Sequence, residues 1–218
     1  KRVLAADVVA LLDALGLDRV RLGGHDWGAF TGFLLCLEAG ERISHFAAAG
    51  LTHPWVQPPS GVGGTIKQTR RLGYMALLAA PVAGKGTMQR VPGFTRTVLR
   101  SSSVHPDRVW SAEEMDRYVA QWSEPARAAA TVGIYRAFLT KELRELASGG
   151  FRDARMEQPS VLLRGVADPV ARPDALGGYE RNAPNLRVEV VEDAGHWLPE
   201  EAPEAMLAGM LDLYERPA

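Results

Sequence analysis

The fold of this chain is organised around one stretch, Arg19-Val20-Arg21-Leu22-Gly23-Gly24-His25-Asp26-Trp27-Gly28-Ala29. It opens with apolar residues that alternate with arginines, which predicts a short strand over 20–22 that the glycines close. A helical run follows over residues 29–39 and ends at Gly40. A strand, a tight glycine-flanked turn and a helix form a nucleophile elbow, which holds its central residue at strained backbone angles.

The central residue of this predicted elbow is Asp26, where serine is usual. A carboxylate at such a turn suits attack on a carbon that carries a strained ether or a halide. Gly24 and Gly28 fit the turn, because we expect a larger side chain at either flank to collide with the neighbouring backbone. The alternative is that Asp26 is a loop acid that caps the following helix.

The composition indicates a globular chain and excludes several classes of partner. With 218 residues, 46% of them hydrophobic, the chain can form one core with an appended module. A net charge of −1 with interspersed acids and bases indicates no nucleic-acid or membrane partner. No run reaches the roughly 18 apolar residues of a membrane span. The single cysteine, Cys36, allows no internal disulfide, so we expect a buried thiol in a cytoplasmic protein.

The order of the remaining patterns predicts an α/β architecture. Leucines and a valine at helical spacing over residues 4–15 precede the elbow, and a second apolar run, Ile43–Ala49, predicts a buried parallel strand. Further strands are expected at Ser160–Gly165 and Leu186–Val191. An amphipathic helix that begins near Pro203 follows them.

A block of helices interrupts these strands. After a loop rich in proline and glycine, we expect helices near residues 65–80, 87–100, 112–121 and 126–146. Ser111 and Glu114 form the pattern of a capping box at the start of the third helix. We therefore expect an α/β core over residues 1–55 and 151–218, with a helical lid over residues 56–150.

Three polar residues follow three of the predicted strands. Asp26 follows the first, Asp168 lies before Pro169 after the third, and His196 follows the fourth. Because sites in open α/β sheets form at the carboxyl ends of the strands, we expect these three side chains to meet. Nucleophile, acid and histidine is also the chain order of α/β-hydrolases. The alternatives are a turn acid at 168 and an ordinary loop histidine at 196.

The chain resembles the α/β-hydrolases of the epoxide hydrolase and haloalkane dehalogenase group. The residues that carry the resemblance are Gly24-His25-Asp26-Trp27-Gly28, Gly165 through Asp168-Pro169, and Ala194-Gly195-His196-Trp197. The resemblance implies parallel strands with flanking helices and an inserted helical lid. It also implies that this chain holds the C-terminal part of the fold, since the family has four further strands and a His-Gly-x-Pro loop before the position of Val3.

The resemblance implies a two-step reaction without a metal or organic cofactor. Asp26 would attack an epoxide carbon and form an alkyl-enzyme ester. His196, held by Asp168, would activate water to hydrolyse the ester to a vicinal diol, while the backbone N–H of Trp27 helps to hold the oxyanion. The histidines and the cysteine show no metal-ligand spacing. His25 is expected to be structural, with its side chain directed away from Asp26.

The family uses two lid tyrosines as acids toward the ring oxygen, and the resemblance assigns these to Tyr74 and Tyr135. Tyr135-Arg136 matches the Tyr-Arg pattern of the family, and Tyr74 stands seven residues before Pro81. The chain departs from the pattern at Gly133-Ile134, where Asn-Trp is common, and at 78–80, where Phe-Gln is common. The alternative is that both tyrosines are aromatic residues of the lid core.

Three functions remain open from the sequence. Epoxide hydrolysis is the preferred hypothesis, because Tyr74 is the feature that favours it over a dehalogenase acting on haloalkanes or haloacids with the same triad. The third is a truncated, catalytically impaired or ligand-binding domain. The lid helices are rich in alanine, leucine and valine, which suggests a small apolar epoxide or halide as substrate. The sequence indicates no oligomeric state.

Overall fold

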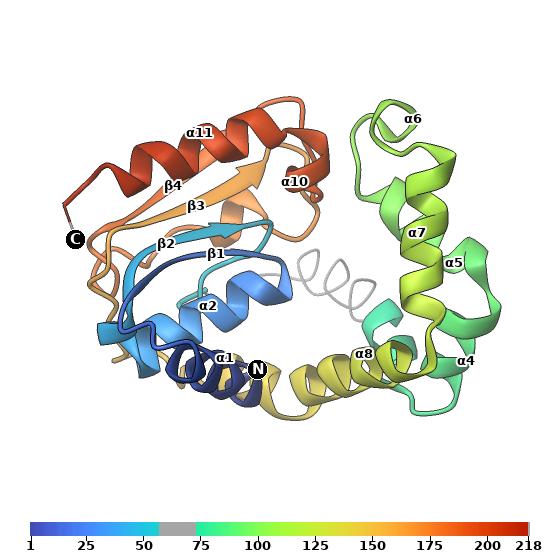
Figure 1. Ribbon diagram of the computed structural model, residues 1–218, viewed down its shortest axis with the longest axis horizontal. Helices are drawn as coiled ribbons and strands as arrows, with labels where there is room; N and C mark the ends of the chain where they lie inside the picture. The colour runs from blue at the N-terminus through green and yellow to red at the C-terminus, as the bar shows by residue number, and fades with distance from the viewer. Residues whose placement is uncertain (57–72, 218) are drawn as a thin grey trace. The chain divides into compact units, whose positions relative to one another are not determined.

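The computed structural model describes residues 1–56 and 73–217, and the chain divides into two compact units (Figure 1). The first unit comprises Lys1–Gln57 and Gly149–Ala218, and the second comprises Pro58–Ser148. All strands of the described part lie in the first unit, which we call the α/β unit. The second, which we call the helical unit, contributes only helices to the described residues.

The α/β unit is built on a parallel sheet in the order β1-β2-β3-β4. These strands are β1 (Val20–His25), β2 (Ile43–Ala49), β3 (Ser160–Gly165) and β4 (Leu186–Val191). Each pair of neighbours is parallel, so all four carboxyl ends lie at one edge of the sheet. The predicted bounds of β2, β3 and β4 are confirmed, whereas β1 extends three residues beyond the predicted strand and reaches the elbow itself.

Helices cover both faces of this sheet (Figure 1). Helix α2 (Trp27–Glu38) packs against β1 and β2, with α1 (Arg2–Ala14) beside it, and α11 (Pro203–Tyr214) packs on the opposite face against β2 and β3. Helix α2 packs closely against β2 at Gly32, which has no side chain. A Cβ at this position would lie 2.3 Å from the Phe46 ring. The core therefore has two layers of side chains, one on each side of β2 and β3.

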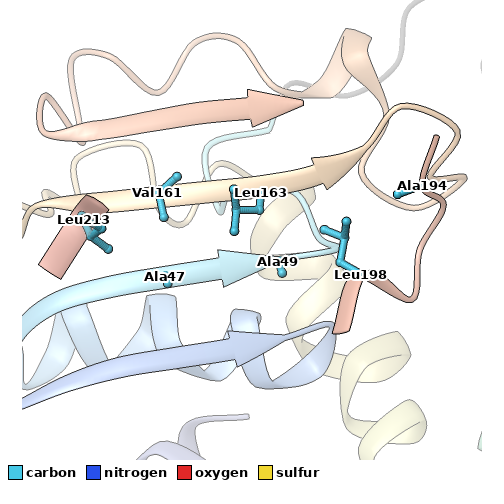
Figure 2. Packing of buried hydrophobic residues seen from close by; sticks show 7 residues of the cluster. All are labelled: Ala47, Ala49, Val161, Leu163, Ala194, Leu198 and Leu213. Atoms are coloured by element: carbon cyan, nitrogen blue, oxygen red, sulfur yellow. The ribbon is translucent and has the colours of Figure 1, made fainter. Parts of the chain in front are cut away.

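The layer beneath α11 reaches from the middle of the sheet to its carboxyl edge (Figure 2). Its fully buried members are the small or aliphatic residues Ala47, Ala49, Val161, Leu163, Ala194, Leu198 and Leu213. Ala194 and Leu198 come from the segment that follows β4 and from α10 (Leu198–Glu201). This segment, which contains His196, is thus fixed to the core at both ends.

The helical unit consists of short helices joined by tight turns. Residues 73–79 are helical, and they are followed by α4 (Ala83–Arg90), α5 (Pro92–Ser101), α6 (Pro106–Val109), α7 (Ala112–Ser123), α8 (Pro125–Ala137), the π-helical turn η2 (Phe138–Glu142) and α9 (Leu143–Ala147). The predicted capping box is confirmed, since the Ser111 side chain accepts from the Glu114 N–H and the Glu114 carboxylate accepts from the Ser111 N–H.

One predicted helix of this unit needs correction, and another contains a local irregularity. The single helix expected over 87–100 is wrong, because Pro92 ends α4 and becomes the first residue of α5. Proline has no N–H to donate and its ring clashes with the preceding turn. The helix expected over 126–146 is confirmed as helical throughout, from Pro125 to Ala147, with a π-helical turn at η2 in its second half. Part of the helix expected over 65–80 lies outside the described residues.

The short elements were not predicted from the sequence. They are α6, α10, and the 3-10 turns η1 (Gly40–Arg42) and η3 (Pro173–Ala175). Cys36 is buried in α2, and burial raises the pKa of its thiol. Within residues 1–56 and 73–217, no helix combines the length and apolar character that a membrane crossing requires.

Candidate active site

The elbow places Asp26 between the last residue of β1 and the first residue of α2. Its backbone angles are φ 50° and ψ −120°, a conformation that costs energy for any residue other than glycine. Two backbone hydrogen bonds hold it there: the Asp26 N–H donates to the Ala49 carbonyl at 3.0 Å, and the Phe30 N–H donates to the Asp26 carbonyl at 3.1 Å. The side chain keeps 27% of its surface exposed, so the carboxylate can be reached from outside.

Only one of the two flanking glycines is required by close packing. A Cβ at Gly24 would lie 2.6 Å from the backbone carbonyl group of Gly28. Among the described residues outside its own helix, a Cβ at Gly28 would meet no group within 4 Å, so the expectation that a side chain there collides with neighbouring backbone is wrong. The turn is tight because β1 approaches the start of α2 closely at Gly24. The part of α2 that Gly24 faces is the backbone of Gly28.

The structure brings His196 between two carboxylates. Its Nδ1 atom lies 3.3 Å and 3.4 Å from the two oxygens of Asp168, and its Nε2 atom lies 3.8 Å from Oδ1 of Asp26. The Asp168 side chain is completely buried, and it also accepts a 2.6 Å hydrogen bond from the Val170 N–H. The contact with Asp26 is longer than a hydrogen bond, which leaves Asp26 available to a third reactant.

The two carboxylates change the acid–base behaviour of His196. Burial by itself lowers the pKa of this histidine, but the hydrogen bond to Asp168 and the charges of Asp26 and Asp168 outweigh burial and raise the pKa above its ordinary value of 6.5. The neighbouring His25 behaves in the opposite way, since burial and the charge of His196 lower its pKa. Of the two histidines, His196 is therefore the one suited to accept a proton.

The segment that presents His196 is bound to the carboxyl edge of the sheet. The end of β3 passes so close that a Cβ at Gly165 would lie 2.1 Å from the Gly195 carbonyl oxygen. The Ala167 N–H donates to the Ala194 carbonyl at 3.1 Å. Glu201 of α10 accepts the N–H groups of Gly195 and Trp197, at 3.0 Å and 2.9 Å.

Glu201 had no role in the sequence analysis. In the sequence, Glu201 stands out only as an acidic residue five positions after His196 and two before Pro203. An acidic residue at this place also fits the first turn of a helix. Its contacts are with backbone N–H groups, so they could be found only once the path of the loop was known.

The remaining predicted site residues are Trp27, Tyr74 and Tyr135. Trp27 is the first residue of α2, where backbone N–H groups point out of the helix at its positive end. The two tyrosines lie together in the helical unit, with ring centroids 6.0 Å apart in an edge-to-face arrangement. Tyr135, on α8, is buried, and Tyr74 is partly buried. Their roles toward Asp26 stay predictions.

The described residues contain no group of three histidine, cysteine, aspartate or glutamate side chains that could hold a metal ion. The site consists instead of two carboxylates and one imidazole, with backbone N–H groups at the start of α2. Such a set can provide a nucleophile, a base and an electrostatic partner for that base.

The sequence matches the model of the α/β-hydrolase fold over residues 1–203, and the chain belongs to that family. It is similar to epoxide hydrolase A of Mycobacterium tuberculosis, with 26% identity over 96% of this chain and 73% of the relative. The AB hydrolase superfamily protein YfhM of Bacillus subtilis is 23% identical over 92% of this chain and 67% of the relative.

Comparison of structures gives the same fold. The crystal structure of epoxide hydrolase A from Mycobacterium thermoresistibile matches with a TM-score of 0.74 and 24% identity, over 99% of this chain and 75% of that one. The predicted α/β-hydrolase fold and the resemblance to epoxide hydrolases, at low identity, are thereby confirmed.

Proposed function

We propose that this protein hydrolyses an epoxide to a vicinal diol through an alkyl ester on Asp26. The observation that carries the proposal is the position of His196, with one ring nitrogen facing Asp26 and the other facing the buried Asp168. An aspartate at the elbow, rather than a hydroxyl, makes attack on an alkyl carbon the suitable first step. Similarity to the epoxide hydrolase of Mycobacterium tuberculosis supports the same chemistry.

In the first step, a carboxylate oxygen of Asp26 bonds to an epoxide carbon, and the bond between that carbon and the ring oxygen breaks. The ring oxygen takes a proton from a phenol, the role that we assign to Tyr74 and Tyr135. A phenol with a pKa near ~10 is protonated at neutral pH and can donate both a hydrogen bond and a proton. The edge-to-face contact of the two rings keeps the phenols in one region of the helical unit, which we propose is a lid.

In the second step, His196 removes a proton from water, and the hydroxide attacks the ester carbonyl carbon of Asp26. The N–H of Trp27, at the positive end of α2, stabilises the oxyanion that forms. The intermediate collapses, the bond to the alkyl oxygen breaks, and the imidazolium returns its proton to the departing alkoxide. The raised pKa of His196 supports this role, because Asp168 stabilises the positive charge that the ring acquires.

We further propose that the substrate is small and apolar and that the protein is cytoplasmic. The described helices of the helical unit bury apolar side chains such as Leu78, Leu99 and Val132. The single cysteine is buried in α2, as suits a protein that does not depend on disulfides.

Trapping of the ester tests the proposal. The His196→Gln variant, mixed with styrene oxide, should retain attack by Asp26 and lose hydrolysis, so that a covalent adduct on the peptide containing Asp26 accumulates. Mass spectrometry of the digested protein measures it, and the Asp26→Asn variant should show no adduct.

The same trap separates the competing functions. Incubation with 1-chlorobutane or chloroacetate and measurement of released chloride detects a dehalogenase, and chloride release without diol formation would contradict our proposal. Absence of any adduct or product with all three compounds would favour a domain that binds ligands without turning them over.

A further inference from the structure

His25 makes a hydrogen bond that fixes the backbone of His196. Its Nε2 atom lies 2.7 Å from the His196 carbonyl oxygen. A carbonyl oxygen can only accept, so Nε2 must carry the hydrogen and donate it. The His25 ring also packs against the rings of His196 and Trp197, with centroids 5.0 Å and 5.8 Å away.

The same backbone is bound on its other side by Glu201. This carboxylate accepts from the N–H of Gly195 and the N–H of Trp197, the two residues that flank His196. One carbonyl and two N–H groups within three residues are therefore held by side chains from β1 and α10. The His196 carbonyl and the Trp197 N–H belong to the peptide group that follows His196, and the Gly195 N–H belongs to the peptide group before Gly195. These bonds therefore hold the backbone on both sides of His196 and restrict the direction in which its imidazole leaves the backbone.

Gly50, just after β2, provides the space for this arrangement. It has φ +65°, and a Cβ there would lie 2.7 Å from His25 Nε2 and 3.1 Å from the His196 carbonyl oxygen. A side chain at position 50 would thus enter the hydrogen bond itself. Glycine at position 50 therefore leaves room for the close contact between His25 and the His196 carbonyl.

The charge state of His25 suits a donor next to a base. Burial and the nearby His196 lower the pKa of His25, whereas Asp168 and Asp26 raise the pKa of His196. His25 therefore stays neutral while His196 takes up a proton. A neutral donor holds the carbonyl without placing a second positive charge 5.0 Å from the imidazolium ring.

We propose that His25 is a positioning residue, which together with Glu201 holds the His196 backbone so that the imidazole faces the ester on Asp26 and the Asp168 carboxylate at once. This inference rests on the proposed function and adds a residue to it. Since His196 acts only in the second step, loss of the His25 hydrogen bond should slow hydrolysis of the ester and leave its formation nearly unchanged.

Single-turnover kinetics with styrene oxide test this role. Rapid quenching and mass spectrometry follow the formation and decay of the adduct in the parent protein and in His25→Leu and His25→Gln. We expect His25→Leu to slow decay about 10- to 100-fold, the scale of a displaced catalytic group, with formation changed less than about 2-fold. His25→Gln should recover most of the decay rate, because its amide nitrogen can donate from the position of Nε2.

A matched pair of glycine variants gives a second measurement that leaves His25 in place. Gly50→Ala and Gly16→Ala impose the same strain, since both glycines have φ +65°, but a Cβ at Gly16 meets no atom of the described residues within 4 Å. Gly50→Ala should slow decay of the adduct, whereas Gly16→Ala should not.

Equal slowing of both steps in His25→Leu, or equal decay rates in the two glycine variants, would overturn the positioning role while leaving the proposed function intact. No adduct even in His196→Gln would overturn the proposed function and this inference with it.

Discussion

Asp168 is a main determinant of the electrostatic environment of His196. Its side chain is completely buried, and its two oxygens face the Nδ1 atom of His196 at 3.3 Å and 3.4 Å. A buried carboxylate in this position favours the tautomer with hydrogen on Nδ1 and leaves Nε2 as the base. From the sequence, Asp168 could be located only in the loop that follows a predicted strand. The structure shows its contact with His196, on which its proposed role depends.

The Asp168→Asn substitution should separate the two steps of the reaction. Formation of the ester should change little, but its hydrolysis should slow by about 10²-fold or more, because a neutral amide does not stabilise the imidazolium. Since Asp168 raises the pKa of His196, its loss should also move the inflection of the hydrolysis rate to lower pH.

Adduct decay measured from pH 5 to 9 gives both values, and the exposed Asp153→Asn provides the control. An unchanged inflection in Asp168→Asn would contradict the assigned role.

Contacts between a side chain and the backbone could not be predicted, although a structural role was expected for His25. Asp26, Asp168 and His196 follow strands, so the order of strands was enough to expect them at one edge of the sheet. Glu201 and His25 act on the N–H and carbonyl groups around His196, and these contacts depend on the path of the loop after β4. No periodicity or spacing in the sequence encodes that path.

The packing of α2 against β2 affects where the elbow lies. Helix α2 can approach β2 closely because Gly32 faces the Phe46 ring, which also meets Phe33 edge to face at 5.0 Å between centroids. A shift of α2 would move Asp26, since this residue directly precedes the helix. Packing at one glycine is thus linked to the geometry of the site.

Substitution of Gly32 by alanine should destabilise the fold. The added Cβ would lie 2.3 Å from the fully buried Phe46 ring, so we expect a loss of about 1–3 kcal/mol in the free energy of unfolding. The matched control is Gly133→Ala in α8, where a Cβ meets nothing within 4 Å and alanine should stabilise by about 0.5–1 kcal/mol. Urea unfolding followed by circular dichroism measures both, and equal effects would contradict this account of the packing.

An element could be predicted well where the residues at its ends break the apolar pattern of the sequence. The apolar runs of β2, β3 and β4 end at glycine, acidic or loop residues, and their predicted bounds are those observed. In the helical unit the apolar spacing continues across Pro92, so periodicity alone joined α4 and α5 into one helix. The π-helical turn η2 lies within a continuous helix and was not predicted from the sequence.

At the scale of the whole molecule, the proposed mechanism takes its residues from both units. The α/β unit holds Asp26, Asp168 and His196, and the helical unit holds Tyr74 and Tyr135. The fold class could be predicted because strand order and motif agree, which the family match confirms. The helical unit matches the sequence motifs of the family less well, since Gly133-Ile134 and residues 78–80 depart from them. Its part in the reaction is therefore a prediction.

The tyrosine variants test whether both units act in one reaction. Tyr74→Phe and Tyr135→Phe should each slow formation of the Asp26 ester from styrene oxide about 10- to 100-fold, because the opening ring loses a proton donor. Decay of the ester should stay unchanged. Tyr118→Phe, in α7 of the same unit, is the control, and equal formation rates in all three variants would remove the tyrosines from the mechanism.

One edge of the parallel β-sheet bears on how the whole molecule behaves in solution. Among the described strands, β1 pairs only with β2 and forms an edge. Leu11 and Leu15 in and just after α1, and Leu207 and Leu211 of α11, are more than half exposed. Exposed leucines and an unpaired strand edge are each features that favour association.

Isotope labelling in a single turnover tests the central claim most directly. With enzyme in excess over styrene oxide in water enriched in oxygen-18, attack by Asp26 followed by hydrolysis at the ester carbonyl should leave the first diol unlabelled and place the label in the Asp26 carboxylate. Mass spectrometry of the diol and of the peptide that contains Asp26 gives both quantities. Labelled diol in the first turnover, with Asp26 unlabelled, would mean that water attacks the epoxide directly and would contradict the account.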